Sequence, residues 1–160
     1  MDFKKWLTNE LFNSPSQIQW KNGKYGNKIG KFIINDKKYQ MIIASPMMQG
    51  GPSEISFQLI LPNGEKSEEI TGTGDEFSVF ATVLDGIQHW IKSYNPKSFI
   101  MSAKEPNRKS LYRRMLSLFN KGEWITEEIS DGTFLVYNKK SKKPTEYSDD
   151  EFEPYFSDDY

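Results

Sequence analysis

Cysteine is absent from this sequence of 160 residues, and histidine occurs once, as His89. The lack of cysteine excludes a disulfide framework, a thiolate zinc site and a cysteine nucleophile. A single histidine excludes a metal site with several histidine ligands. No apolar run approaches the ~20 residues of a membrane-spanning helix, and the N-terminus lacks the apolar stretch and cleavage site of a signal peptide. We therefore expect a cytoplasmic protein without membrane contact.

Charge is present in balance but is unevenly placed, since 21 basic and 22 acidic residues give a formal net charge of −1. Residues 145–160 hold seven of the acids and no Lys or Arg, which leaves the rest of the chain near +6. Two interpretations stay open. The tail keeps the protein in solution, or it is an arm that binds a partner or competes for an anion site of the body.

The mass of 18.6 kDa supports one hydrophobic core, because a chain of this size buries roughly 70% of its unfolded surface. We expect a single domain over residues 1–144, with its core at about 29–139. The acidic, aromatic tail of 145–160 follows it.

Hydrophobic periodicity and turn residues predict the elements of the first half of the chain. We expect an amphipathic N-terminal helix and then four strands, the first two joined across Asn35-Asp36. Asn63-Gly64 is predicted to form the type I′ turn of a second hairpin. The expected ranges are 2–12 for the helix and 29–34, 38–45, 55–61 and 66–71 for the strands.

The second half of the chain is predicted to hold two helices and three strands. A capping box, with Thr73 as N-cap and Glu76 as its partner, predicts the start of a helix. The clearest amphipathic stripe of the sequence follows it, and Asn95-Pro96 is predicted to end this helix. A short strand then leads into a helix with a basic face formed by Arg108, Lys109, Arg113 and Arg114. The expected ranges are 97–102 for the strand, 106–121 for the second helix, and 123–130 and 133–138 for a closing hairpin.

This order predicts an α+β (mixed α/β) fold: a twisted, mostly antiparallel sheet of six to seven strands flanked by helices. An N-terminal helix and the acidic C-terminal tail complete it. Because a helix connects 66–71 to 97–102, we expect these two strands to be parallel.

The succession of elements, with two local motifs, resembles the GNAT family of N-acetyltransferases over roughly residues 29–139. In that family a glycine-containing loop before a helix holds the pyrophosphate of coenzyme A through backbone amides. Gly72, Thr73 and Gly74 stand at the corresponding position. The resemblance implies that these three residues bind acetyl-CoA. Asp75 and Glu76 follow at once, however, and two acids would repel a pyrophosphate from the helix N-terminus. An ordinary capped helix is the alternative interpretation.

The second motif is the stretch Asn107-Arg108-Lys109-Ser110-Leu111-Tyr112, which resembles an asparagine followed by Leu-Tyr on the family's next helix. The resemblance implies that Tyr112 protonates the departing thiolate and that Asn107 binds the cofactor or orients the tyrosine. A core tyrosine with a bonded hydroxyl is the alternative for Tyr112. Glu68 and Glu69 are candidates for the general base, and we select Glu69; a solvated pair beside a turn is the alternative.

The sequence departs from the family where the acceptor pocket would be built, because only Asn35-Asp36 separates the first two predicted strands. The function predicted first is acetyl transfer from acetyl-CoA to an amine. The alternative is a non-catalytic binding or assembly protein, in style similar to bacteriophage accessory or virion proteins. In that case Phe152, Tyr155 and Phe156 of the tail contact a protein partner or a second copy of the chain.

Single-stranded nucleic-acid binding is a further alternative, since the basic helix face could track phosphates and bases could stack on exposed aromatic rings. Trp20, Tyr25 and Tyr39 are the candidate rings. We rank this alternative last, because a solvated helix face explains such charges equally well. His89 is predicted to be a surface residue.

Overall fold

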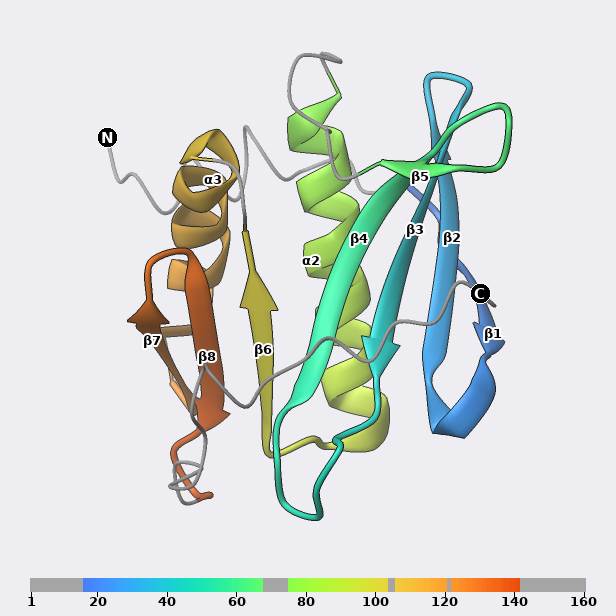
Figure 1. The fold of residues 1–160 in the computed structure, drawn as a ribbon. Helices are drawn as coiled ribbons and strands as arrows, with labels where there is room; N and C mark the ends of the chain where they lie inside the picture. Colours follow the sequence, from blue (N-terminus) through green and yellow to red (C-terminus); the bar gives the residue numbers. More distant parts are fainter. Residues whose placement is uncertain (1–15, 68–74, 104–105, 121, 142–160) are drawn as a thin grey trace. The chain divides into compact units, whose positions relative to one another are not determined.

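The computed structural model describes residues 16–67, 75–103, 106–120 and 122–141 (Figure 1). The helix predicted at 2–12 and the tail of 145–160 lie outside these residues. The strands are β1 Gln19–Asn22, β2 Lys28–Ile34, β3 Lys37–Ala44, β4 Ser53–Ile60, β5 Lys66–Ser67, β6 Ser98–Ser102, β7 Trp124–Ser130 and β8 Thr133–Asn138. The helices are α2 Glu76–Tyr94 and α3 Pro106–Leu116, and the short 3₁₀ turns are η2 Lys24–Gly26 and η3 Ser117–Asn120.

The strands form one eight-stranded, mostly antiparallel sheet in the order β1-β2-β3-β4-β6-β8-β7, with β5 paired to β4 beside this path. The prediction of a mixed α+β fold is confirmed. The chain divides into two compact units, which are described separately below. Of the described residues, unit 1 holds 16–22, 28–42, 57–67 and 75–95, and unit 2 holds 23–27, 43–56, 96–103, 106–120 and 122–141.

The parallel strand pair differs from the prediction. β6 lies parallel to β4, with Ser53 opposite Phe99 and Glu54 opposite Ile100. Within the described residues that segment contributes only the two-residue β5, which pairs antiparallel with the end of β4. The eight-residue β4 therefore provides the edge that a crossover strand needs.

The hairpin predicted across Asn35-Asp36 is confirmed, whereas the type I′ turn predicted at Asn63-Gly64 is wrong. Asn35 and Asp36, between β2 and β3, both have positive φ values of 49° and 65°, as a type I′ turn requires. Of the pair Asn63-Gly64, only Gly64 has a positive φ, 88°. The Gly64 N–H donates to the Leu61 carbonyl and the Leu61 N–H to the Glu65 carbonyl. The loop after β4 is thus a three-residue connection with glycine at its left-handed position.

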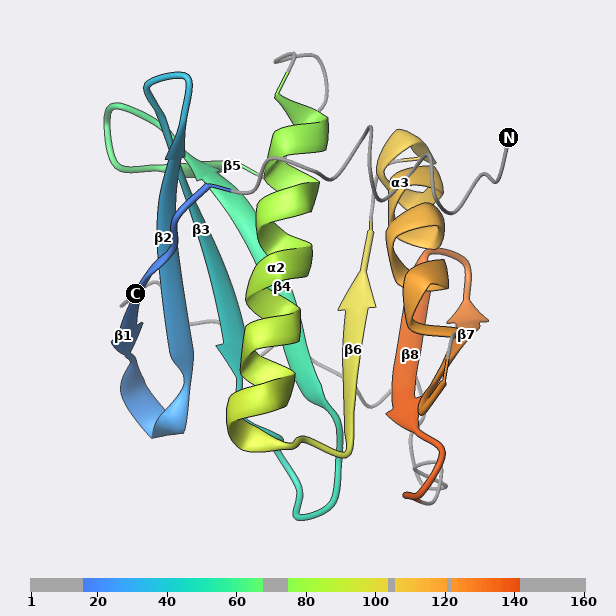
Figure 2. The same ribbon diagram turned by 180° about the vertical axis from the view of Figure 1, so that it is seen from behind.

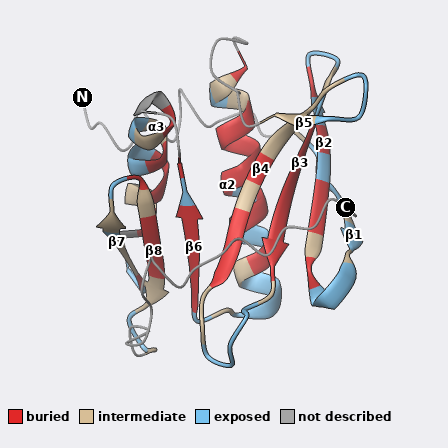
Figure 3. Cartoon of the chain, in the orientation of Figure 1, coloured by how far each residue is buried: buried red, intermediate tan, exposed pale blue. Residues whose placement is uncertain are grey.

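Unit 1 has its core between α2 and the strands that the helix covers (Figures 1 and 2). The ring of Phe80 in α2 meets the ring of Phe57 in β4 edge to face at 5.2 Å between centroids. β3 is buried along nearly its whole length (Figure 3). The predicted helix cap is wrong in position, because the helix begins at Glu76 and Asp75 occupies the N-cap. The end predicted at Asn95-Pro96 is confirmed, since Asn95 has left-handed backbone angles and follows the last helical residue.

Unit 2 has its core between α3, with the η3 turn after it, and the strands β6, β8 and β7 (Figure 2). Phe99 of β6 is fully buried, and its ring contacts those of Phe119 at 5.8 Å and Trp124 at 6.2 Å. The Thr126 hydroxyl of β7 donates to the Leu116 carbonyl at the end of α3. The predicted hairpin around Asp131-Gly132 is confirmed.

The basic stretch predicted that Arg108 lies on a solvated helix face, and this prediction is wrong. It is only 3% exposed, and its guanidinium lies 5.8 Å from the centroid of the Tyr112 ring. Tyr39, a candidate for exposed stacking, is fully buried and stacks on Phe32. Tyr25 is 70% exposed, and His89 is exposed as predicted.

No helix in the described part of the chain combines the length and apolarity that crossing a lipid bilayer demands.

Candidate functional site

The parallel pair of β4 and β6 in unit 2 is short. The two strands are in register only at Ser53–Phe99 and Glu54–Ile100. Beyond these pairs, the residues Ile55 and Ser56 of β4 and Met101 and Ser102 of β6 have no partner in each other's strand among the described residues. β6 is instead paired through all five of its residues with β8. At the C-terminal end of β6, the backbone groups that face β4 are therefore not paired with β4 in a parallel ladder.

One face of this strand pair carries buried polar side chains. Glu54 is 7% exposed and Ser98 is 3% exposed. Because side chains alternate along a strand and Glu54 is opposite Ile100, the side chains of Glu54, Ser56 and Ser98 point to the same face. The hydroxyls of Ser56 and Ser98 are buried and have no hydrogen-bond partner within the described ranges. Buried polar groups usually have such partners, so this face is a candidate surface for polar contacts with a ligand.

Tyr112 lies on the other face, in the packed interface of α3. It is 2% exposed, and its ring is 6.3 Å from that of Phe134 in β8. Phe134 is opposite Met101 of β6, which points away from the face that holds Ser98 and Ile100. The structure therefore places Tyr112 and the buried acid Glu54 on opposite faces of the sheet of unit 2.

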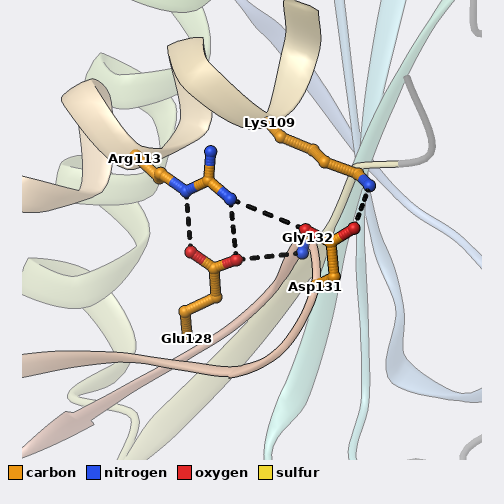
Figure 4. A network of polar contacts seen from close by, with 5 residues as sticks. All are labelled: Lys109, Arg113, Glu128, Asp131 and Gly132. Atoms are coloured by element: carbon orange, nitrogen blue, oxygen red, sulfur yellow. Dashed lines mark hydrogen bonds and ion pairs between the residues drawn. The ribbon is translucent and has the colours of Figure 1, made fainter. Parts of the chain in front are cut away.

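A network of charged groups fixes the β7–β8 hairpin to α3 (Figure 4). The Arg113 guanidinium donates to both carboxylate oxygens of Glu128, at 2.7 and 2.9 Å. The Lys109 ammonium donates to the Asp131 carboxylate at 2.6 Å, and the Gly132 N–H donates to Glu128 at 3.2 Å. Two cations of the basic helix face are thus paired with acids of the hairpin, which argues against phosphate binding on this face.

This network makes the hairpin sensitive to acid. The two hydrogen bonds from Arg113, followed by that from the Gly132 N–H, lower the pKa of Glu128 from 4.5 to about 2. Because the folded-state pKa is below the ordinary value, the stabilisation is fully present above pH 4.5 and is lost as the pH falls through about 2.

We expect a carboxyl NMR titration to give a midpoint for Glu128 of about 2 in the natural chain. In Arg113→Gln the midpoint is expected to return toward 4.5, because the two strongest donors to the carboxylate are lost. Arg114→Gln, one position along the same helix and exposed, is the control and should leave the midpoint unchanged. Equal midpoints in all three chains would show that the Arg113–Glu128 pair does not persist in solution.

A second polar cluster lies in unit 1, at the start of α2. Asp75 is 4% exposed, and its carboxylate accepts hydrogen bonds from Asn35 Nδ2 at 2.6 Å, Lys37 Nζ at 2.9 Å and the Tyr39 hydroxyl at 3.4 Å. It makes no side-chain bond to the first helix amides. Burial alone would raise the pKa of Asp75, but the bonds from Asn35 and Lys37 outweigh it and lower the pKa. The carboxylate is thus ionised and neutralised by Lys37.

Most residues that the sequence singled out are not described. Glu69, Gly72, Thr73, Gly74, Phe152, Tyr155 and Phe156 lie outside the described ranges, and of Asn107 only the helical backbone is described. Their predicted roles stay predictions. Sequence reasoning missed Glu54 and Ser98, because a single acid or serine in a strand pattern does not indicate burial. The pairing of β4 with β6 was the information needed to find them.

Comparison of this chain with protein-family models, with curated proteins and with solved structures finds no match.

Proposed function

We propose that this protein binds an acyl-coenzyme A, with acetyl-CoA as the first candidate, and transfers the acyl group to an amine. The observation that carries the proposal is the parallel pair of β4 and β6, which ends after two residue pairs. The GNAT family, which the sequence resembles, separates two neighbouring strands of its sheet to admit the pantetheine arm of coenzyme A. A pair that separates after Glu54 and Ile100 leaves backbone groups that such an arm can use.

An electrostatic objection to the proposal is weakened by the cluster around Asp75. Two acids in the first turn of α2 would repel a pyrophosphate. The Asp75 carboxylate, however, is turned to Asn35 and Lys37 and makes no bond to the helix amides. Its charge is compensated by an ammonium group at 2.9 Å. Of the two acids, only Glu76 therefore still repels an anion bound at the N-terminus of α2.

The proposed roles follow the resemblance. Acetyl-CoA supplies an acyl group activated as a thioester, and the amine nitrogen forms a bond to its carbonyl carbon as the carbon–sulfur bond breaks. The Tyr112 hydroxyl donates its proton to the sulfur, and Glu69 accepts the proton that the amine loses. Gly72, Thr73, Gly74 and Asn107 hold the cofactor. A phenol suits the proton transfer because its apolar ring can sit in a water-poor surrounding, and the burial of Tyr112 provides such a surrounding.

Isothermal titration of the full chain with acetyl-CoA tests this proposal. A dissociation constant tighter than ~100 μM supports it, and the absence of heat at millimolar ligand, a limit of about 4 kcal/mol, contradicts it. Coenzyme A without an acyl group is the second ligand, and weaker binding of this compound would show that the acyl group is recognised. Binding of ATP with the same affinity would reduce the observation to general phosphate binding and contradict the proposal.

The composition of the tail favours a second candidate function, assembly with a protein partner or another copy. Residues 145–160 combine seven acids with five aromatic residues. Acids alone are sufficient for solubility, whereas aromatic side chains add apolar area that gains from burial against protein. We propose that Phe152, Tyr155 and Phe156 contact the partner and that the acids face its Lys or Arg side chains.

Deletion of residues 145–160 is expected to change the number of chains in the particle in solution, because it removes the proposed contact. The measurement is light scattering at low and high salt, since screening weakens the charged part of the contact. The triple variant Phe152→Ala, Tyr155→Ala, Phe156→Ala retains all seven acids and separates the apolar part from the charged part. The same number of chains and the same salt response in the natural chain and in both variants would show that the tail is not an assembly arm.

A further inference from the structure

The strands of unit 1 have one face that packs on α2 and an opposite face that carries no helix in the described part of the unit (Figures 1 and 2). The Trp20 ring and the Met41 sulfur both lie close to Gly86 of α2, so these side chains point to the helix. Because side chains alternate along a strand, Lys21 and Gln40, the sequence neighbours of these two residues, point to the opposite face.

Lys21 and Lys31 are neighbours on the face opposite to α2. Lys21 is opposite Ile29 in the β1–β2 pair, which makes Lys31 its diagonal neighbour. Gly30 faces the Trp20 ring on the helix side, so the next residue, Lys31, points away from α2. The positive charge of Lys21 is the main cause that lowers the pKa of Lys31, followed by partial burial. Both side chains are exposed.

Lys38 and Lys66 extend this positive surface. Lys38 is two positions from Gln40 in β3 and shares its face. Lys66 is opposite Ile60 of β4, which points away from α2 by the same alternation. The charges of both lysines also lower the pKa of Lys31, because they lie near it. We call the following four residues together the lysine face: Lys21, Lys31, Lys38 and Lys66.

Within the described ranges, no acid forms an ion pair with the lysine face. The cations that form ion pairs in these ranges are Lys37, Lys109, Arg113 and Lys140. Like charges that are adjacent in a sheet destabilise it, and the lowered pKa of Lys31 shows that its neighbours disfavour its charge. An anion bound on this face would therefore remove a repulsion within the folded chain.

A buried amide donor belongs to the same face. Gln40 is 1% exposed, and its Nε2 has no hydrogen-bond acceptor within the described ranges. Buried polar groups usually have partners, so an acceptor oxygen from outside these ranges would satisfy it. Ile33, two positions from Lys31 and on the same face, is 57% exposed and offers apolar contact beside the charges. The face thus combines cations, an N–H donor and an exposed isoleucine.

Residues 145–160 of this chain have the complementary composition. They hold seven acids, no Lys or Arg, and five aromatic residues. Carboxylates can pair with the lysines and accept from the Gln40 amide, and aromatic rings can pack on Ile33 and on the lysine stems. A nucleic-acid strand would also supply anions, but its bases need aromatic rings on which to stack. The strand positions on this face of unit 1 hold no aromatic residue within the described ranges.

We propose that the lysine face binds residues 145–160 of a second copy of the chain. This inference rests on the assembly proposed for the tail, and it names the surface that receives it. The carboxylates of the tail lie along the lysines, one of them accepts the Gln40 N–H, and the aromatic rings cover Ile33. Every copy has one tail and one lysine face, so two copies can exchange tails and form a closed, symmetric pair.

Light scattering of full-length variants tests the proposal. The face variant, Lys21→Glu with Lys31→Glu and Lys38→Glu, is expected to weaken pairing about a hundredfold, because three attractions between charges become repulsions. The control variant makes the same three changes at exposed lysines outside the lysine face and should pair like the natural chain. Its positions are Lys92, Lys97 and Lys139. Circular dichroism of each variant verifies that a loss of pairing does not arise from unfolding.

A charge exchange between two chains identifies the groups that meet. The tail variant, Asp149→Lys with Asp150→Lys and Glu151→Lys, is expected to lose pairing like the face variant. An equimolar mixture of the two variants brings each natural part against a natural partner and each reversed part against a reversed partner. The mixture should therefore pair about a hundredfold more tightly than either variant alone.

Four results would overturn the proposal. If the tail variant loses pairing and the face variant does not, the assembly stands but the tail binds elsewhere. If both variants lose pairing and their mixture does not recover it, the tail and the lysine face do not meet. A natural chain that stays single contradicts the assembly as well. Dissociation of the natural pair by an oligothymidylate at a lower concentration than by a synthetic peptide of residues 145–160 would assign the face to nucleic acid.

Discussion

Tyr112→Phe is expected to reduce the turnover of acyl transfer about 10²-fold, the usual contribution of a general acid. The substitution removes only the hydroxyl and retains the ring that packs beside Phe134. The fold should therefore persist, with a loss of stability of at most about 1 kcal/mol for one hydrogen bond. The measurement is the release of free thiol from acetyl-CoA, with the most active acceptor from a panel of primary amines.

Tyr137→Phe is the matched control for this prediction. It makes the same chemical change in the same unit, at a tyrosine whose hydroxyl donates to Glu127 at 3.1 Å, and it should leave turnover unchanged. Removal of a group that acts only in the transition state lowers kcat and kcat/KM equally. Equal turnover in Tyr112→Phe and the natural chain would exclude Tyr112 as the proton donor, even if acetyl-CoA binds.

Gly132→Ala is expected to destabilise the protein by roughly 2–4 kcal/mol, because two costs add at this position. Gly132 has a φ of 81°, the left-handed region in which a Cβ is unfavourable. The new Cβ would also lie 2.5 Å from the Ala103 carbonyl oxygen. That oxygen belongs to the backbone, and the Ala103 N–H in turn donates to the Gly132 carbonyl at 2.8 Å. Neither group can move without breaking the contact between β6 and the β7–β8 turn.

Gly64→Ala separates the two costs. Gly64 also has a positive φ, 88°, but no atom would lie within 4 Å of its Cβ. We expect a loss of only about 1 kcal/mol there, from backbone strain alone. Urea unfolding of both variants measures the difference. Equal losses would show that the close approach of Ala103 is relieved in solution, and that the turn is held less rigidly than the structure indicates.

Local patterns by themselves determined most elements of this fold. The apolar stripe from Phe80 to Tyr94 predicts a helix, because residues at i, i+3 and i+4 share one face, and α2 ends at Tyr94 as expected. The hairpins at Asn35-Asp36 and Asp131-Gly132 were visible for a similar reason, since their turn residues tolerate positive φ. The absence of cysteine and the single histidine limited the chemistry before any fold was considered.

Only the tertiary structure decided which strands and side chains come together. The pairing of β6 with β4 depends on contacts between segments more than 40 residues apart, which no local window contains. The burial of Arg108 depends on the residues that pack around it, because a charged residue in a basic stretch is predicted to be solvated until those neighbours are known. The position of the Trp20 ring likewise depends on Gly30 and Gly86, 56 positions apart, which leave room for one indole. Packing between distant residues is the physical cause in each case, and it sets the sites that a sequence pattern cannot predict.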